Sequence, residues 1–582
     1  MELDPCSRRS TGMTAVAARV SRFIPGTAVP LALVLVACLV LPVAVFFVYG
    51  FWTSDLFGIH KTWTLEQYRS ALSGFYLDVL LKTLATALGV AVSVVAVAYA
   101  AAFVVTFRLR RARNLFVLLI VASALTSYLV RIYSWKTVLG PHGLISSALE
   151  RLGVVNGPID FLLYNRFSVT VALAQILIPF AFLPIYAAMQ SVDRDLLNAG
   201  RDLGASPTQT FRKVLWPLTS HGVIYGFAFS LIIAGGDYVT PEMLGGKKGI
   251  MTGRIINDQF GLTQNFSLAS ALAFVLLVGF LGVLVVVPLA QKATIPRPRL
   301  PRVRLGARAR SKRSWDKFFL GVLLAYLYVP LLAVVALSLN DSNFASFPMR
   351  GITLHWYTVV LGSGPYRSAF LTSLEVAAAV TALALAIGLP AALALARRRF
   401  ILRPLLSLGL LACLGLPGIV IGFSIFAMLR QLDQAPSLVS VVLGQLLVVL
   451  PFVVLTLAAR VQRMDPSLEE AGRDLGCTRF GVFRRITAPL IVPVMIGAGL
   501  ISFALSMDEF VVTHFTVGDH ATFPVLIWAQ LHRRGLDPSV NAAASILVLS
   551  TIVLFVVLAL FSRSRRGKDA TREIVPLGTT SD

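Results

Sequence analysis

Three acidic residues lie in stretches that are otherwise apolar enough to cross a membrane. Asp237 belongs to the apolar segment at about 219 to 244, and Asp508 and Glu509 belong to the one at about 491 to 515. An ionisable group at membrane depth costs about 2.5 to 3.5 kcal/mol, so such residues are functional candidates by default. A carboxylate there can attract an ammonium group, and nearby aromatic faces can add about 0.5 to 2 kcal/mol through cation–π contacts. The sequence therefore predicts a pathway for a small cation.

The candidate residues of the predicted pathway come from two regions of the chain, residues 131–238 and residues 508–510. They are Asp237, Tyr238, Asp508, Glu509, Phe510, Arg131 and Trp135. Asp237 and Glu509 are 272 residues apart, which is the spacing of an internal repeat, so we expect them to face each other across a pseudo-twofold axis. In the alternative interpretation, the acids lie at outer helix ends, where they are solvated or pair with Arg131 or Lys136.

Other chemistry finds little support in the residue pattern. The seven His and four Cys residues show no metal-ligand spacing, and no Ser/His/Asp or Cys/His arrangement can be assigned. We therefore expect no catalytic residues, no bound metal and no cofactor on this chain. A membrane-embedded enzyme, which needs convergent catalytic groups, is disfavoured for the same reason.

The elements that must position these residues are membrane helices. The 582 residues are 57% hydrophobic and only 14% charged, with a mean hydropathy of +0.79. A span needs about 20 apolar residues. Such segments occur at about 27 to 52, 78 to 105, 114 to 136, 166 to 190, 219 to 244, 266 to 290, 316 to 339, 368 to 396, 402 to 429, 437 to 459, 491 to 515 and 540 to 562. We predict an all-α polytopic membrane protein with about 12 transmembrane helices.

The basic residues indicate how these helices are oriented. The net charge is +24, and most of the 52 Lys and Arg residues fall in the two tails and in alternate loops. Basic loops mark the cytoplasmic side. We therefore expect both termini to be cytoplasmic. Because membrane orientation accounts for the surplus charge, nucleic acid is excluded as a partner.

One polar stretch occurs twice. Residues 197 to 218 read LNAGRDLGASPTQTFRKVLWPL, and residues 469 to 490 read EEAGRDLGCTRFGVFRRITAPL. Six segments per half place both halves in the same orientation, as a parallel repeat. The predicted domains are a cytoplasmic tail (1–26), a first transmembrane domain (27–290), a basic cytoplasmic linker (291–314), a second transmembrane domain (315–562) and a cytoplasmic tail (563–582).

The residues of this repeat predict two short helices joined at a glycine. In the second copy, Ser467 and Glu470 fit a capping box, and Gly476 fits the left-handed residue that ends a helix. In the first copy, Ser206 and Gln209 fit a capping box that starts the second helix, with Pro207 in its first turn. An amphipathic elbow of no special function would share these features, and the residues alone leave that alternative open.

Both copies resemble the EAA loop of binding-protein-dependent ABC importer permeases. The resemblance implies a coupling helix that docks on a cytoplasmic ATPase dimer, where ATP binds, and a periplasmic or lipid-anchored solute-binding protein on the other side. It assigns ATPase coupling to Asn198, Ala199, Gly200, Asp202, Gly204, Phe211 and Arg212, and to Glu470, Ala471, Gly472, Asp474, Gly476, Phe483 and Arg484. Asn198 departs from the usual Glu, so we expect unequal docking of the two halves.

Further stretches narrow the resemblance. TSYLVRIYSW (126–135) and GGDYVTPEMLGG (235–246) resemble one spermidine/putrescine permease subunit, and LPGIVIGFSI (416–425) and MDEFVVTHFTVG (507–518) resemble the other. The chain thus looks like both subunits fused. The resemblance implies that it moves a small cationic solute, a polyamine such as spermidine or putrescine, across the lipid of a bacterial inner membrane by alternating access driven by a separate ATPase. Relatives that import ferric ion or aminoalkylphosphonates are one alternative. An ion-coupled secondary transporter is another, although it has no need for paired elbows.

Overall fold

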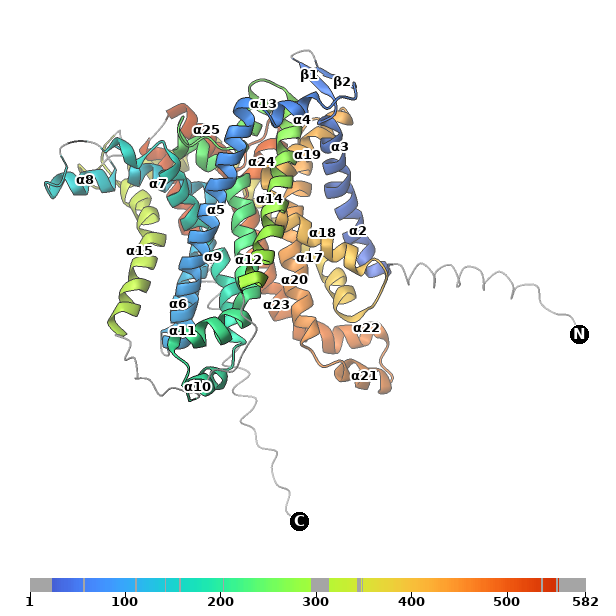
Figure 1. The fold of residues 1–582 in the computed structure, drawn as a ribbon. Helices are drawn as coiled ribbons and strands as arrows, with labels where there is room; N and C mark the ends of the chain where they lie inside the picture. The colour runs from blue at the N-terminus through green and yellow to red at the C-terminus, as the bar shows by residue number, and fades with distance from the viewer. Residues whose placement is uncertain are drawn as a thin grey trace, which may run out of the picture.

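A computed structural model shows a mainly helical protein with one small two-stranded sheet (Figure 1). It describes residues 24–550 and 553, apart from 56–57, 110–111, 142, 156, 158, 203, 295–312, 343–346, 348 and 535–536. Most of the predicted linker and both predicted tails, apart from a few residues at their edges, lie outside the described residues, so the domain boundaries stay a prediction.

The elements of the two halves follow one another in a repeated order. The first half contains α2 (Val29–Val34), α3 (Leu41–Tyr49), β1 (Thr53–Asp55), β2 (Gly58–His60), α4 (Glu66–Ala71), α5 (Gly74–Phe103), α6 (Arg113–Ala124), α7 (Tyr128–Leu139), α8 (Leu144–Arg151), α9 (Arg166–Gln190), α10 (Arg194–Asp202), α11 (Pro207–Thr210), α12 (Trp216–Gly236), α13 (Thr252–Gly261) and α14 (Phe266–Thr294). The second half contains α15 (Arg313–Leu337), α16 (His355–Gly362), α17 (Gly364–Arg397), α18 (Arg403–Gly415), α19 (Gly418–Gln431), α20 (Leu438–Gln462), α21 (Ser467–Asp474), α22 (Arg479–Val482), α23 (Ala488–Asp508), α24 (Val511–Thr516) and α25 (Phe523–Arg534). Short 3₁₀ or π-helical turns connect several of them, including η3 (Leu35–Val40), η4 (Val104–Arg108), η6 (Phe211–Leu215), η7 (Pro241–Gly245) and η8 (Phe483–Thr487).

The predicted fold class is confirmed. Among the described residues, nine helices are long and apolar enough to cross a membrane, and two bent helix pairs raise the number of spans to 11. A shorter apolar helix, Pro538–Ser550, falls within the twelfth predicted segment, and most of the rest of that segment lies outside the described residues. A helix satisfies every backbone hydrogen bond within one segment, which is what a lipid environment demands.

The third span of each half is broken, which hydropathy did not predict. α6 and α7 meet at a bend of 92°, and α18 and α19 at 107°. Pro417 lies at the second break, where its lack of an N–H group removes a helical hydrogen bond. At the first break, Ser127 caps α7 by accepting from the Val130 N–H group at 3.5 Å. Each bend points a helix start toward the interior.

The two halves interlock through their first spans. α3 packs against α19 of the second half, where the Tyr49 hydroxyl donates to the Ala427 carbonyl at 3.3 Å. Conversely, α15 packs against α6 and α7 of the first half, and the Tyr328 hydroxyl donates to the Leu119 carbonyl at 2.7 Å. Arg108 and Asp316 add an ion pair between the halves. The chain therefore forms one interlocked body.

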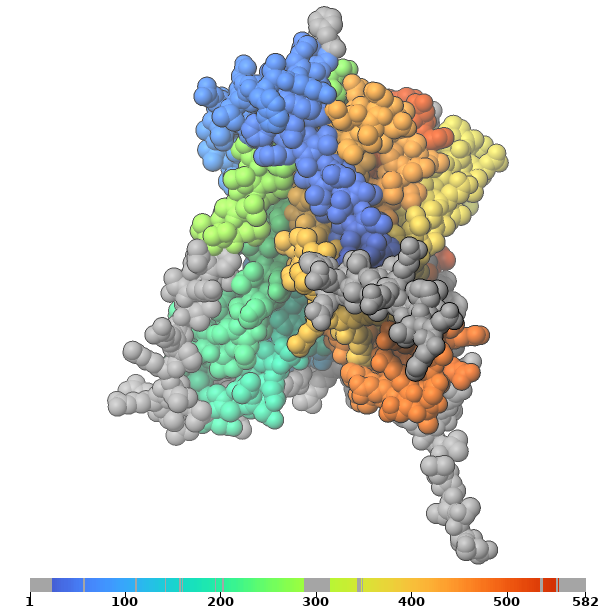
Figure 2. Space-filling model, turned by 90° about the vertical axis from the view of Figure 1, so that its right-hand side faces the viewer, coloured from blue at the N-terminus to red at the C-terminus, as the bar shows by residue number. Residues whose placement is uncertain are grey.

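The two repeated polar stretches lie at the same end of the molecule. Figure 1 shows α10 and α21 at the bottom, opposite the hairpin, α13 and α25. In Figure 2, they belong to two lower lobes, teal for the first half and orange for the second. This arrangement leaves two separate surfaces, one from each half, at a single end.

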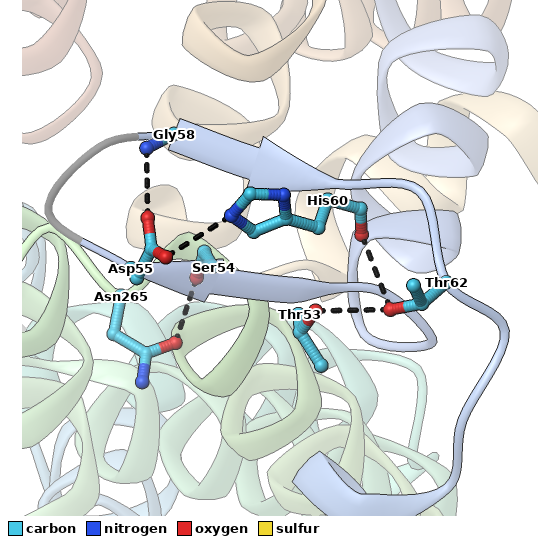
Figure 3. Close-up of polar contacts among 7 residues, drawn as sticks. All are labelled: Thr53, Ser54, Asp55, Gly58, His60, Thr62 and Asn265. Carbon is cyan, nitrogen blue, oxygen red and sulfur yellow. Dashed lines mark hydrogen bonds and ion pairs between the residues drawn. The ribbon is translucent and has the colours of Figure 1, made fainter.

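The β1–β2 hairpin is fastened to the start of α14 (Figure 3). Ser54 donates to Asn265 Oδ1 at 2.9 Å, and its hydroxyl oxygen accepts from the Ser267 N–H group at 3.1 Å. Asp55 closes the turn by accepting from the Gly58 N–H group and contacting His60 Nε2, both at 3.0 Å. The hairpin is thereby held in place over the end of the first half opposite α10.

Candidate functional site

Each polar repeat folds into an elbow of two short helices. α10 and α21 end at glycines with left-handed backbone, φ +76° at Gly204 and +82° at Gly476. In the second elbow, Gly476 N–H donates to the Arg473 carbonyl at 2.8 Å, and Cys477 N–H donates to the Gly472 carbonyl at 3.1 Å. This pair of bonds is the Schellman motif, which satisfies carbonyls at a helix end and favours glycine at the left-handed position. The predicted glycine bend is present in both copies.

The capping residues match the prediction in the first elbow. Ser206 Oγ accepts from the Gln209 N–H group at 3.2 Å, and Gln209 Oε1 accepts from the Ser206 N–H group at 3.0 Å, with Pro207 in the first turn. Thr478 starts the corresponding helix of the second elbow by accepting from the Gly481 N–H group at 3.1 Å. Thr478 was missed, although it stands 272 residues after Ser206.

The predicted capping box of Ser467 and Glu470 is wrong. Ser467 is the first helical residue, and its N–H group donates to Asp465 Oδ1 at 3.0 Å. That hydrogen bond is the largest cause of the lowered pKa of Asp465. Asp465 supplies the acceptor at this helix start, because an aspartate side chain readily accepts a hydrogen bond from the N–H group two residues later in the chain. Glu470 is exposed, and its side chain makes no hydrogen bond or ion pair among the described residues, while its N–H group donates to the Pro466 carbonyl at 3.1 Å.

The predicted coupling residues divide into an exposed group and a packed group. Exposed on the elbows are Asn198, Ala199, Asp202, Phe211, Arg212, Glu470, Ala471, Asp474, Gly476 and Arg484. Gly200, Gly204 and Phe483 are half-buried, and Gly472 is buried. Gly472 is tightly packed, because a Cβ atom there would lie 2.6 Å from Ile486 Cδ1. The exposed group forms two polar surfaces at one end of the molecule.

The second elbow is also tied to the end of α17. Glu469, next to Glu470, lies 3.7 Å from Arg397 Nη2 and accepts from the Thr487 hydroxyl at 3.2 Å. The counterpart of Arg397 in the first half is Arg108, which pairs instead with Asp316 across the halves. The two elbows thus share a backbone but differ in their supporting contacts.

The predicted pathway acids lie around the broken helices between the halves. A cavity of about 250 Å³ is lined by Tyr128, Phe180, Phe229, Ile233, Gly236, Asp237, Tyr238, Cys413, Leu414, Leu416, Pro417, Gly418, Ile421, Val448, Phe452, Leu505, Glu509, Val511 and Val512. Both halves contribute to this wall, and both bent spans reach it. Asp237 and Glu509 therefore line one cavity, and their facing each other across a pseudo-twofold axis stays a prediction.

Asp237 has spare hydrogen-bonding capacity in that cavity. The side chain is buried, and its Oδ1 accepts from the Tyr128 hydroxyl and from the Val239 N–H group. Its Oδ2 is buried and has no partner of ordinary hydrogen-bond geometry among the described residues, although the Thr240 hydroxyl and N–H group lie near the carboxyl group. A buried carboxylate oxygen without a donor is costly unless a ligand supplies one. Asp237 therefore offers an acceptor site to a donor-rich solute.

The two neighbouring acids of the second half have different partners. Both oxygens of Asp508 accept from the Tyr128 N–H group, at 2.8 and 3.1 Å, so Asp508 caps α7 of the opposite half. Glu509 turns to its own half and accepts from the Val512 and Thr513 N–H groups, both at 2.8 Å. The acids are half-buried or buried and hydrogen-bonded, and none of the ion pairs seen among the described residues joins them to Arg131 or Lys136.

Tyr238 and Phe510 belong to an aromatic cluster shared by the halves. The Tyr238 ring lies 6.5 Å from Phe510 and 5.6 Å from Phe515. Phe260 of α13 stacks on Phe423 of α19 at 3.7 Å. Tyr238 also lines the cavity, so it joins this cluster to the cavity wall. α13 lies toward the end opposite the elbows (Figure 1).

Arg131 and Trp135 are placed away from the cavity wall. Arg131 Nη1 donates to the Ile176 carbonyl at 3.3 Å. Trp135 Nε1 donates to Gln175 Oε1 at 3.1 Å, and its ring packs on Tyr326 at 5.5 Å. Both side chains are buried between α7, α9 and α15. Their pathway role stays a prediction, whereas Tyr128, which sequence reasoning missed, touches both Asp237 and Asp508.

A further contact between the halves is made by residues of α25, η7 and α13. His532 Nε2 of α25 lies 3.3 Å from Glu242 Oε1, and Asn257 donates to the other oxygen of Glu242 at 3.5 Å. The hydrogen bond with Glu242 raises the pKa of His532 above 6.5, against an opposing effect of burial and of Lys136. This contact strengthens when His532 is protonated.

Comparison with known proteins identifies two matching regions. Residues 95–299 and 384–567 match the family model described as binding-protein-dependent transport system inner membrane component. The spermidine/putrescine transport system permease protein PotC of Escherichia coli K12 is 32% identical over 248 residues, covering 42% of this chain and 93% of PotC. PotB of Haemophilus influenzae is 32% identical over 210 residues, covering 36% of this chain and 73% of PotB.

A solved structure of a bacterial ABC transporter involved in the import of the acidic polysaccharide alginate also matches. Its TM-score is 0.35 at 14% sequence identity, and the match covers 44% of this chain and 99% of that chain.

Proposed function

The chain belongs to the binding-protein-dependent transport system inner membrane component family, and from that premise we propose that it forms both permease halves of a polyamine importer. It is a multi-pass membrane protein and the permease component of an ABC importer, with two repeats of the family domain in one chain. Its relatives in this family are permeases, not enzymes. The solute, the partners and the orientation are the proposed part.

The observation that carries the polyamine assignment is the free Oδ2 of Asp237 in the shared cavity. A protonated amine brings N–H donors and a positive charge to this oxygen, while Glu509 lines the same wall and the Tyr128 and Tyr238 rings flank it. Hydrogen bonds to charged groups contribute about 1.5 to 3 kcal/mol. The elongated apolar parts of a polyamine suit the remaining wall, which is mostly Phe, Leu, Ile and Val. Similarity to PotB and PotC supports the same solute class.

The elbows are the proposed ATPase contacts. Two exposed polar surfaces at one end suit a dimeric partner with two grooves. The basic loops support a cytoplasmic orientation for that end and for both termini. ATP binds on the partner, and this chain holds no nucleotide. The chain lies in an inner membrane. A solute-binding protein docks on the end of the chain opposite the elbows. Closure of the ATPase moves the elbows, separates the aromatic cluster and opens the cavity outward.

Uptake measurements test this proposal. Cells with and without the chain are compared for uptake of labelled putrescine, spermidine and ferric ion, and we expect uptake of the two polyamines only. Asp237→Asn should lower polyamine uptake about 10- to 100-fold, because it removes a charge-assisted bond of about 1.5 to 3 kcal/mol. Asp433→Asn, which changes an exposed acid, is the matched control.

Two results would contradict the proposal. Unchanged polyamine uptake after neutralisation of Asp237, Asp508 and Glu509 would remove these acids from the pathway. Transport in proteoliposomes that is driven by an ion gradient alone, without an ATPase, would show a secondary transporter instead.

A further inference from the structure

Two short helices, α4 and α16, follow the first span of each half, and the chain that enters and leaves them exposes apolar side chains. Trp63 and Leu65 are 73% and 55% exposed, and their counterparts Ile352 and Leu354, each 289 residues later, are 82% and 66% exposed. Leu72 and Leu361, one further pair at the same spacing, are exposed as well. A soluble surface rarely repeats an exposed apolar patch at equivalent positions. The repetition indicates a surface that both halves present to the same environment.

The opposite face of each helix is pinned at the end of a membrane span. Tyr68 lies so close to Gly50 that a Cβ atom there would be 2.6 Å from the tyrosine oxygen. Tyr357, its counterpart, shares a 2.7 Å hydrogen bond with Ser338. The first spans end at Tyr49 and at Leu337. Both helices are therefore held at the level where the chain leaves the hydrocarbon core, at the end opposite the elbows.

The exposed apolar surface is continuous with that of the spans. α4 leads into α5 through exposed Phe75, and Leu81 and Leu88 continue the exposed apolar side of α5. α16 leads into α17, where Leu371 and Leu374 are exposed in the same way. On a membrane-spanning helix, such side chains face lipid. The same lipid surface therefore extends to α4 and α16.

A hollow beside α4 has the chemistry of a lipid headgroup site. It encloses about 640 Å³ and is lined by Phe51, Trp63, Thr64, Leu65, Glu66 and Arg69. Aromatic and aliphatic side chains beside one acidic and one basic group match a zwitterionic phospholipid, whose phosphate and ammonium need opposite charges. The hairpin, fixed to the start of α14, holds the chain that leads to Trp63 (Figure 3).

We propose that α4 and α16 are paired interfacial anchors that lie in the phospholipid leaflet at the end opposite the elbows. Tryptophan is enriched at this depth of a membrane, and a helix that lies in the interface buries its apolar face among the lipids. The anchors fix the first span of each half while the other helices move. This role requires only that the chain spans a membrane, so it does not depend on which solute is carried.

Spin labels at two matched pairs of positions test the anchors. In a functional background without native cysteines, Leu65→Cys, Leu354→Cys, Glu66→Cys and His355→Cys are labelled with a nitroxide in nanodiscs of phosphatidylethanolamine and phosphatidylglycerol. Glu66 and His355 are exposed neighbours at the same 289-residue spacing. Glu66 also lines the hollow, on its polar side, so this pair serves as the control for the water and headgroup side of the interface. The ratio of collision with oxygen to collision with a water-soluble nickel chelate should be several-fold higher at positions 65 and 354 than at 66 and 355. ATP-driven uptake by each labelled variant shows that it is folded.

Two outcomes would overturn the anchors. Equally low collision ratios at all four positions would place both helices in water. A nickel collision rate that is high at positions 65 and 354 and falls only after addition of a solute-binding protein would identify a protein-docking surface instead. Absence of polyamine uptake by the unlabelled chain would refute the proposed solute. It would not affect the test of the anchors, which depends only on the collision ratios.

Discussion

Gly472→Ala and Gly200→Ala change the same position of the two elbows and should have opposite effects. Both glycines lie within a short helix and accept the hydrogen bond that closes the glycine bend. At Gly472, a new Cβ atom would lie 2.6 Å from Ile486 Cδ1 and 3.3 Å from Val482 Cγ2. At Gly200, the nearest atoms belong to Thr210 at 3.8 Å, which is ordinary contact.

The expected difference follows from two opposing terms. Alanine stabilises a helix by about 0.5 to 1 kcal/mol relative to glycine. Overpacking applies only at Gly472 and costs at most about 3 kcal/mol, because Ile486 Cδ1 is the end of a flexible side chain that relieves part of the contact by turning away. The second elbow should therefore lose up to about 3 kcal/mol relative to the first, which is at most roughly a 150-fold difference in the population of locally opened elbow.

Hydrogen exchange measures this difference directly. The Cys477 N–H group, bonded to the Gly472 carbonyl, should exchange faster in Gly472→Ala, whereas the Ala205 N–H group, bonded to the Gly200 carbonyl at 3.0 Å, should exchange no faster in Gly200→Ala. Solute-stimulated ATPase activity should fall only in the first variant. Equal exchange in the two variants would refute the packing argument.

Three further outcomes are expected. Gly476→Pro should abolish ATPase coupling at an unchanged membrane level of the chain, because proline cannot adopt φ +82° and removes a donor, at a cost of about 3 kcal/mol or more; retained ATP-driven uptake would contradict this. Glu470→Ala should lower ATP-driven uptake more than Asn198→Ala, because only Glu470 offers an exposed charge to a partner; equal losses would argue against unequal docking. The contact of His532 with Glu242 should weaken as pH rises through the raised pKa of His532, because the folded state favours the protonated ring. As pH rises from below 6.5 through the raised pKa of His532, the melting temperature should therefore fall more steeply in the wild type than in His532→Gln. Parallel melting curves for the two proteins would refute the linkage.

Features that depend on local geometry could be predicted from the sequence. Gly204 and Gly476 were found because a left-handed backbone restricts the residue type at a helix end. Ser206 was found because capping needs an acceptor three residues before its donor. The same rule failed at Ser467, because it tests one motif at a time and does not consider other acceptors nearby. Asp465, two residues earlier, provides the acceptor at this helix start. Thr478 could have been found by applying the repeat spacing to Ser206.

Features that depend on packing between the halves could not be predicted. Hydropathy records that a segment is apolar, not its direction, so the 92° and 107° bends were invisible, although Pro417 was a usable signal for the second. Asp508 and Glu509 are adjacent in sequence, yet one caps a helix of the opposite half and the other caps its own. Which partner each acid takes is decided by the tertiary arrangement around Tyr128.

The repeat fixes the backbone of both halves but not the roles of equivalent residues. Asp508 caps α7 across the interface, whereas its equivalent Gly236 has no side chain, and a Cβ atom there would lie 2.3 Å from Pro417 at the start of α19. An acidic side chain at 236 would therefore have no room, and Pro417 would offer it no N–H group. The start of α7 is thus capped by the Asp508 carboxylate of the opposite half, whereas at the start of α19 Pro417 packs against Gly236. Because a fused chain never has to pair with a copy of itself, the two contacts can diverge, and a role assigned to Asp508 does not transfer to its counterpart.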